Sequence, residues 1–169
     1  MGCLFSKKSE EFDPPRYESD AETARNMSMH YTVHYPKHEE RKASAIYTKT
    51  HKSLKHMPCF ICGKTNQKDG IHVETHHFFV EKAMENAIDW EKFGDFAQTC
   101  HHFQTGEFIG DLFDWKAVAK NPDLFVDSPS NMIVLCKEHH TSRIGIHHVP
   151  FPEWITQKFA KDGFTVLSL

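Results

Sequence analysis

Apolar and polar positions follow a helical period in several stretches of the chain. Between Val80 and Ile88, apolar residues recur three and four positions apart, which predicts a helix over 80–93 with one buried face. A basic helix is predicted over 38–56, which contains neither Gly nor Pro and ends before Pro58. Two further helices are predicted, over 106–120 and 152–161.

A tight turn and a strand are predicted after the basic helix. The stretch PCFICGKTN is typical of a zinc knuckle, in which Gly63 would allow a positive φ after the second cysteine. IHVETHHFFV, residues 71–80, is typical of a strand. Together these elements predict one α+β domain over 37–169, preceded by a flexible N-terminal arm over 1–36.

The charge of the chain limits how it could bind nucleic acid. Its 20 basic and 23 acidic residues give a formal charge of −3, which argues against a protein that coats nucleic acid by bulk electrostatics. Charge is segregated, however, with a net +6 over 37–68 and a net −6 over 81–127. The basic segment is either a solvated helix face or a phosphate-binding surface. Its candidate contacts to nucleic acid are Arg41, Lys42, Lys49 and Lys52.

Cysteine usage favours an intracellular metal-binding protein. The chain has five cysteines, two of them in a Cys-x-x-Cys pair, and no hydrophobic signal segment, which argues against a disulfide framework. No apolar run approaches the ~20 residues of a membrane helix, so we expect a soluble protein. The start, MGCLFSKK, fits an acylation pattern at Gly2 and is the one reason to consider a lipid-anchored protein.

Four residues with metal-ligand spacing predict a structural Zn²⁺ site. Cys59 and Cys62 form the knuckle pair, and Cys136 and His139 repeat the same spacing. A structural zinc ion takes four ligands in a tetrahedron, and Cys₃His is one of its usual donor sets. We therefore expect these residues to join the knuckle to the start of a later helix across 73 intervening residues.

Two further motifs, ETHHF and NMIVLCKEHH, resemble those of the HNH endonucleases. In that family a strand ends in a metal-binding Asp or His and a general-base His, and the later motif carries an Asn, two zinc ligands and a final His. The resemblance covers roughly residues 58–148 and implies a treble-clef-like ββα-metal core with a structural zinc site and added helices. Small HNH proteins of bacteria and their phages are similar, which implies a location in the cytoplasm of a bacterium or a phage-infected cell.

The resemblance implies a role for each polar residue of the two motifs. His77 would be the general base, and Asn131 would orient its imidazole or the loop that carries it. His76 and His140 would hold one catalytic divalent cation, which would be Mg²⁺, Mn²⁺, Ni²⁺ or Zn²⁺. Strand alternation places Glu74 on the same face as His76, where it would either hydrogen-bond a ligating imidazole or remain exposed.

Two departures from the family pattern change the expected architecture. His77 and Asn131 are 54 positions apart, more than in the compact family core, so we expect a helical insertion over about 80–127. Ile144 occupies a position that is often a metal-binding histidine in relatives. The third ligand of the catalytic metal would then be a histidine after the bend at Gly145, His147 or His148.

The function implied by the resemblance is that of a metal-dependent DNA endonuclease or nickase, which hydrolyses phosphodiester bonds through a histidine general base. Double-stranded DNA would be its substrate, and phage packaging or replication proteins are candidate partners. The alternative is a non-catalytic zinc-binding module for nucleic acid or complex assembly, which the net acidic charge favours. No stable membrane association is expected unless Gly2 is acylated.

Overall fold

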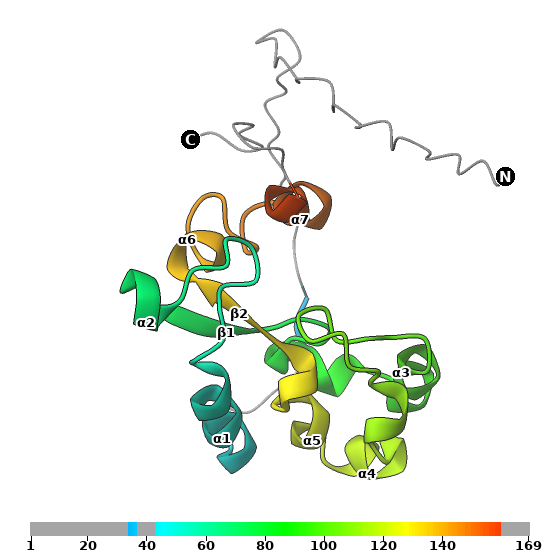
Figure 1. Ribbon diagram of the computed structural model, residues 1–169. Helices are drawn as coiled ribbons and strands as arrows, with labels where there is room; N and C mark the ends of the chain where they lie inside the picture. Colours follow the sequence, from blue (N-terminus) through cyan, green and yellow to red (C-terminus); the bar gives the residue numbers. More distant parts are fainter. Residues whose placement is uncertain (1–33, 37–42, 160–169) are drawn as a thin grey trace, which may run out of the picture.

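The computed structural model describes residues 34–36 and 43–159, which form helices around a small sheet and belong to the α+β class (Figure 1). The acylation pattern at Gly2 and most of the arm predicted over 1–36 lie outside the described residues. Residues 34–36 themselves belong to no helix or strand. Within the described part of the chain, no helix has the length and apolar character needed to cross a membrane.

The sheet consists of β1 (Val73–His77) and β2 (Met132–Cys136), which pair antiparallel. All five residues of β2 are buried, which agrees with its continuous apolar sequence MIVLC. The register pairs Glu74 with Leu135 and His76 with Ile133. A strand was predicted over 71–80, and β1 occupies the middle of that range.

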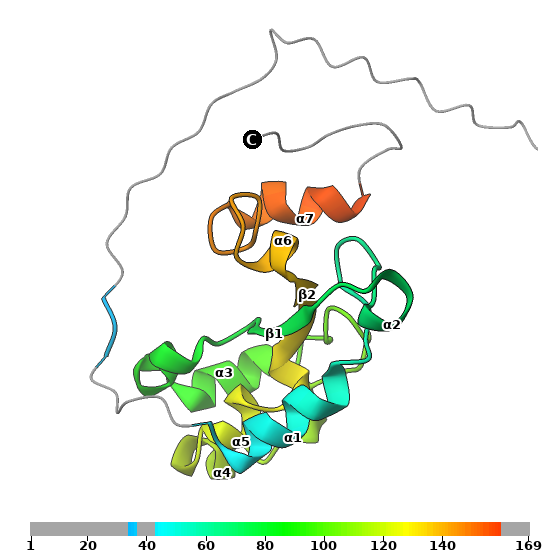
Figure 2. The same ribbon diagram turned by 90° about the vertical axis from the view of Figure 1, so that its left-hand side faces the viewer.

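Short helices lie on both sides of the sheet. α2 (Asn66–Asp69) precedes β1, and α6 (Lys137–His140) follows β2 directly. Figures 1 and 2 show α7 (Phe151–Phe159) next to α6, on the side of the sheet opposite α1 (Ala45–Leu54). The buried Trp154 of α7 packs into the apolar cluster that contains Cys59 and Cys136.

α1 corresponds to the C-terminal part of the basic helix predicted over 38–56. The helix begins after Ser44, whose hydroxyl oxygen accepts a hydrogen bond from the backbone N–H of Tyr47. Buried Leu54 packs at its other end with apolar side chains of both strands. Residues 37–42 of the predicted helix lie outside the described part of the chain.

Between the strands the chain forms a helical lobe. Its elements are, in order, the 3₁₀ helix η2 (Lys82–Ala87), α3 (Trp90–Ala97), η3 (Gly110–Leu112), α4 (Trp115–Lys120), α5 (Asp123–Val126) and η4 (Pro129–Asn131). The single helix predicted over 80–93 was wrong, because Ile88 is extended and Asp89 starts a new helix. The Asp89 carboxylate accepts from the backbone N–H of Lys92, a typical N-cap contact. Asp114 caps α4 in the same way and divides the next predicted helix.

Aromatic side chains fill the core of this lobe. Phe125 is fully buried, and the centroid of its ring lies 5.0 Å from that of Phe93 and 5.3 Å from that of Trp115. Val80 and Trp90 belong to the same apolar cluster. The lobe therefore has a core of its own, beside the clusters that cover the sheet.

Candidate metal centres

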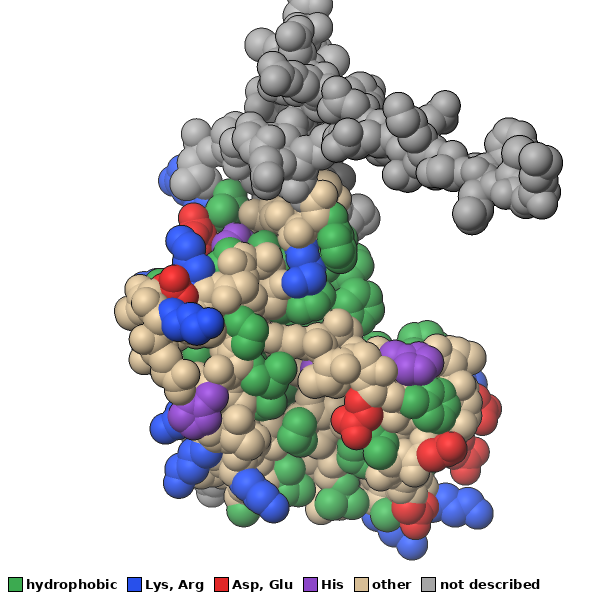
Figure 3. Space-filling view, in the orientation of Figure 1, with side chains coloured by type: hydrophobic (Ala, Val, Ile, Leu, Met, Phe, Trp, Pro, Cys, Tyr) green, Lys and Arg blue, Asp and Glu red, His purple; other side chains and the backbone are tan. Residues whose placement is uncertain are grey.

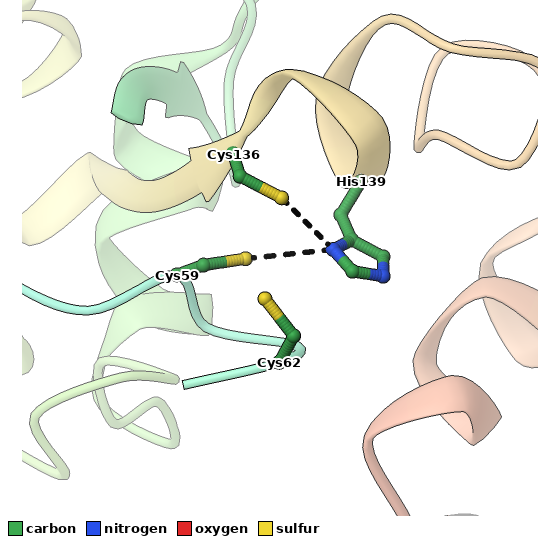
Figure 4. Close-up of side chains that lie close together, drawn as sticks. All are labelled: Cys59, Cys62, Cys136 and His139. Carbon is green, nitrogen blue, oxygen red and sulfur yellow. Dashed lines mark hydrogen bonds between the residues drawn. The ribbon is translucent and has the colours of Figure 1, made fainter. Parts of the chain in front are cut away.

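Three cysteines and one histidine converge where β2 meets α6 (Figure 4). Sγ of Cys136 lies 3.1 Å from Nδ1 of His139, and Sγ of Cys59 lies 3.6 Å from the same nitrogen. Cys62 turns its sulfur toward this point, and the four ligand atoms all lie within 4.8 Å of one another. The Cys₃His cluster, which contains the four residues predicted from their spacing, could hold a metal ion.

Backbone hydrogen bonds explain how the knuckle presents its thiols. The N–H of Gly63 donates to the carbonyl of Cys59 at 2.8 Å, and the N–H of Cys59 donates to that of Lys64, also at 2.8 Å. Gly63 has a φ of 69°, as predicted, a conformation that a side chain would disfavour. The N–H of Phe60 donates to the carbonyl of Val134 at 2.7 Å and so joins the knuckle to β2.

The other half of the cluster is held by α6 and α7. Cys136 is the N-cap residue of α6, so His139 follows within the same helical turn. Nε1–H of Trp154, which is fully buried, donates to the carbonyl of His139 at 2.9 Å. Packing of α7 therefore fixes the backbone that carries His139.

The three thiols of the cluster ionise unequally. Burial raises the pKa of Cys62 to about 12, and it also raises the pKa of Cys136. Burial opposes ionisation of Cys59 too, but hydrogen bonds from His139 and nearby backbone groups lower its pKa to about 6. A cation among the sulfurs would favour three thiolates, since metal binding displaces the protons of its ligands.

Three histidines form a second cluster. His76 comes from β1, His140 from α6 and His147 from the loop after α6. Nε2 of His140 lies 3.1 Å from Nε2 of His147, and the ligand atoms of all three histidines lie within 4.8 Å of one another. Three imidazoles could hold one divalent ion and leave further coordination positions open.

A bend at Gly145 brings His147 back toward His140. Gly145 is buried, and a Cβ at this position would lie 2.4 Å from the carbonyl oxygen of His140, so no other residue fits without a shift. The bend passes Ile144, which occupies the expected ligand position. Of the two histidines that could replace it, the structure brings His147 into the cluster, while His148 is exposed and lies outside it.

Two carboxylates lie near the Nδ1 atoms of His140 and His76. Oε2 of Glu74 is 2.6 Å from Nδ1 of His140, which leaves Nε2 for the cluster. Oε1 of Glu81 lies 3.9 Å from Nδ1 of His76. The short contact with Glu74 fixes the orientation of the His140 ring, whereas the separation at Glu81 is too long for a hydrogen bond. Burial and the charge of nearby His140 lower the pKa of His76 to about 3, so this imidazole is neutral at pH 7.

His77 lines the same cavity as the histidine cluster but has different partners. Its Nε2 lies 3.2 Å from Oδ1 of Asp127, and its ring stacks on that of Tyr47 with centroids 6.3 Å apart. Oδ2 of Asp127 accepts a hydrogen bond of 2.6 Å from Oγ of Ser44. Burial opposes ionisation of Asp127, but the bonds from His77 and Ser44 hold its pKa below the ordinary value.

Asn131 contacts the loop after β1. Its Oδ1 accepts from the N–H groups of Phe79 and Val80, at 2.9 and 3.0 Å. Its Nδ2 donates to the carbonyls of Val80 and Val126, at 2.8 and 2.9 Å. The side chain thus holds the loop rather than the imidazole of His77, the second of the two roles predicted for it.

The histidine cluster opens into a cavity of about 440 Å³. α1 forms one wall through Tyr47 and His51, and β1 and α6 form the others. Nδ1 of His51 lies 3.3 Å from Oγ1 of Thr75, which links this wall to β1. The cavity could admit a ligand that contacts both the histidine cluster and His77.

On the face of the molecule shown in Figure 3, acidic and basic side chains gather on different sides. In Figure 3 most acidic side chains of the face shown gather on the α3 and α4 side, and basic side chains predominate on the α1 and α2 side. Lys49 and Lys52, which were predicted to contact nucleic acid, are exposed on α1. The other two predicted contacts, Arg41 and Lys42, lie outside the described residues.

The arrangement places a candidate cation site and a candidate base beside one open cavity, which suits metal-assisted hydrolysis. It also contains a residue that sequence reasoning missed. Asp127 was one acid among the ten of 81–127, and no motif marks it, because its contact with His77 spans 50 positions. No family model, curated protein or solved structure matches this chain.

Proposed function

We propose that this chain is a metal-dependent endonuclease or nickase of the HNH class, which cleaves phosphodiester bonds in double-stranded DNA. The observation that carries the proposal is the position of His77 on the wall of the cavity that holds His76, His140 and His147. The order of β1, β2 and α6 around the two clusters supports a ββα-metal core.

Hydrolysis of a phosphodiester needs a nucleophilic water, a proton acceptor and stabilisation of the charge on the phosphate. A divalent cation at the histidine cluster would supply Lewis-acid stabilisation of a phosphate oxygen. His77 would take a proton from the water as its oxygen bonds to phosphorus, while the bond to the departing sugar oxygen breaks. That oxygen would be protonated from solvent. Glu74 would keep His140 oriented throughout.

The Cys₃His cluster is, in this proposal, a structural zinc site. Its sulfur-rich donor set favours zinc over Mg²⁺ or Ca²⁺, which prefer oxygen ligands. Cys59, Cys136 and His139 are buried, which agrees with a closed site that takes no part in the reaction. The ion would brace the junction of β2 and α6 and thereby the position of His140.

The basic side of α1 supports a path for the DNA backbone. Lys49 and Lys52 are exposed on the helix whose Tyr47 and His51 line the cavity. Phosphates bound along α1 would bring an adjacent phosphodiester bond to the cavity. Such local contacts agree with a chain whose net charge is −3, because they need no basic character overall.

A plasmid-nicking assay tests the proposal. Purified protein would be incubated with supercoiled plasmid and Mg²⁺, Mn²⁺, Ni²⁺ or Zn²⁺ in turn, beside His77→Ala. We expect nicking by the unaltered chain and a loss of about 100-fold or more in His77→Ala, the usual contribution of a general base. His101→Ala is the matched control, because His101 is an exposed histidine of the helical lobe.

Circular dichroism and metal content should be unchanged in both variants. Absence of nicking with every ion, or full activity in correctly folded His77→Ala, would overturn the proposal.

A second candidate function is a non-catalytic zinc module that binds nucleic acid or assembles a complex. The acidic net charge and the Cys₃His cluster, in which three of the four residues are buried, favour it. Counting ions separates the two, because the nuclease needs a second, exchangeable ion at the histidine cluster. One tightly held ion per chain and no cleavage would support the module.

A further inference from the structure

Asp127 is buried between α1 and β1, and both of its carboxylate oxygens have partners. Its side chain is 3% exposed. Oδ1 lies 3.2 Å from Nε2 of His77, and Oδ2 accepts from Oγ of Ser44 at 2.6 Å. A buried carboxylate is costly unless its oxygens are hydrogen-bonded, so the three side chains form one unit.

We infer that Asp127 is a positioning residue for His77, which holds the imidazole in the tautomer that carries its proton on Nε2. This inference rests on the proposed nuclease function. An ionised carboxylate can only accept hydrogen bonds, so Asp127 requires an N–H from His77 at Nε2. The neutral ring then has its lone pair on Nδ1, which has no hydrogen-bond partner among the described residues.

α1 holds Asp127 and His77 from the other side. Ser44 is the N-cap residue of α1, so the hydroxyl that donates to Asp127 also accepts from the N–H of Tyr47. The ring of Tyr47 stacks on that of His77 at an interplanar angle of 26°. The first turn of α1 therefore limits both rotation of the imidazole and movement of the carboxylate that orients it.

A purely structural contact would not need a negative charge here. Asn131, four residues further along, is equally buried and holds its loop with a neutral amide that both donates and accepts. An amide at position 127 could accept a bond from one tautomer of His77 or donate to the other. Only the carboxylate selects one of them.

The experiment compares Asp127→Asn with the unaltered chain in two measurements. Long-range ¹H–¹⁵N NMR of the full-length, zinc-loaded protein reports the histidine tautomers, and the His77 signals are identified by their absence in His77→Gln. We expect a proton on Nε2 of His77 in the unaltered chain and a mixture of tautomers in Asp127→Asn. In plasmid nicking, kcat should fall about 10- to 100-fold with KM and metal content unchanged.

Asp123→Asn is the matched control, because Asp123 lies in the same short helix and pairs with Lys82 rather than with His77. It should keep both the tautomer and kcat. A proton on Nδ1 of His77 in the unaltered chain would overturn the inference, as would an unchanged kcat in Asp127→Asn. If the unaltered chain does not nick DNA, the proposed function fails, while the tautomer still decides whether Asp127 orients His77.

Discussion

His139 and His140 are consecutive residues of one helical turn, yet their side chains belong to different clusters. Nδ1 of His139 lies 3.1 Å from Sγ of Cys136, and Nε2 of His140 lies 3.1 Å from Nε2 of His147. α6 is only four residues long, so a single helical turn carries one residue of each cluster.

Cys136→Ser should remove the ion of the Cys₃His cluster and unfold the region around it. A structural zinc site contributes on the order of 10 kcal/mol, comparable to the whole stability of a small domain. Metal analysis and thermal unfolding by circular dichroism measure the two effects. Cys100→Ser is the control, because Cys100 is buried outside the cluster and its thiol donates a hydrogen bond to the backbone carbonyl of Phe96. Cys136→Ser protein that keeps its ion and its melting temperature would contradict this prediction.

His147→Ala should lose the exchangeable ion of the histidine cluster but retain the tightly held ion of the Cys₃His cluster. The variant removes one of three imidazoles and leaves Cys59, Cys136 and their partners intact. Equilibrium dialysis followed by metal analysis should give one ion per chain instead of two. His148→Ala should still bind two, because His148 is exposed and outside the cluster. Equal stoichiometry in the two variants would exclude His147 as a ligand.

The free energy of unfolding should decrease as the pH is lowered from 7.5 to 5.5, when only the Cys₃His cluster holds an ion. The pKa of His76 is about 3 in the folded chain and near 6.5 when unfolded, so the unfolded state binds more protons between these values. The free energy of unfolding is therefore highest above pH 6.5, where His76 is neutral in both states. It decreases below that pH, by about 1 kcal/mol between pH 7.5 and 5.5. Urea unfolding at both pH values measures the change. His76→Gln should reduce the pH dependence by this amount, whereas His101→Gln should not alter it.

Removal of two charges from α1 should weaken DNA binding without affecting metal content. Each phosphate contact adds about 1 to the slope of log affinity against log salt concentration. The double variant Lys49→Ala, Lys52→Ala should therefore lower the slope by about 2. Fluorescence anisotropy of a labelled duplex at several salt concentrations measures it. Lys116→Ala with Lys120→Ala, on the acidic lobe, should leave the slope unchanged; an identical loss there would show that the charge effect is not local to α1.

Local patterns predicted which residues form the Cys₃His cluster because their spacing is a local property. A knuckle places Cys59 and Cys62 side by side, and the first turn of a helix does the same for Cys136 and His139. The positive φ of Gly63 followed from the same turn geometry. The strand β2 was not predicted from its own sequence, although the apolar run MIVLC is typical of a strand that is buried on both faces.

Other features depended on contacts that periodicity does not report. Val80 to Ile88 have helical spacing, but the carboxylate of Asp89 forms an N-cap and divides the segment. Asp127 lies 50 positions from His77, and the packing of α1 against both β1 and α5 brings the two together. Charge counting included Asp127 only in the net charge of 81–127, whereas the structure buries it.

The antiparallel pairing of β1 with β2 has a consequence for the order in which the protein assembles during synthesis. Pairing closes a loop of more than 50 residues, which is entropically costly until the strands meet. The aromatic core of the intervening lobe uses residues from Phe79 to Val126, so it can form before β2 is made. Cys59 and Cys62 then remain without Cys136 and His139, and His76 without His140 and His147, until β2 and α6 have left the ribosome, so an ion at either cluster would be bound only after the lobe can fold.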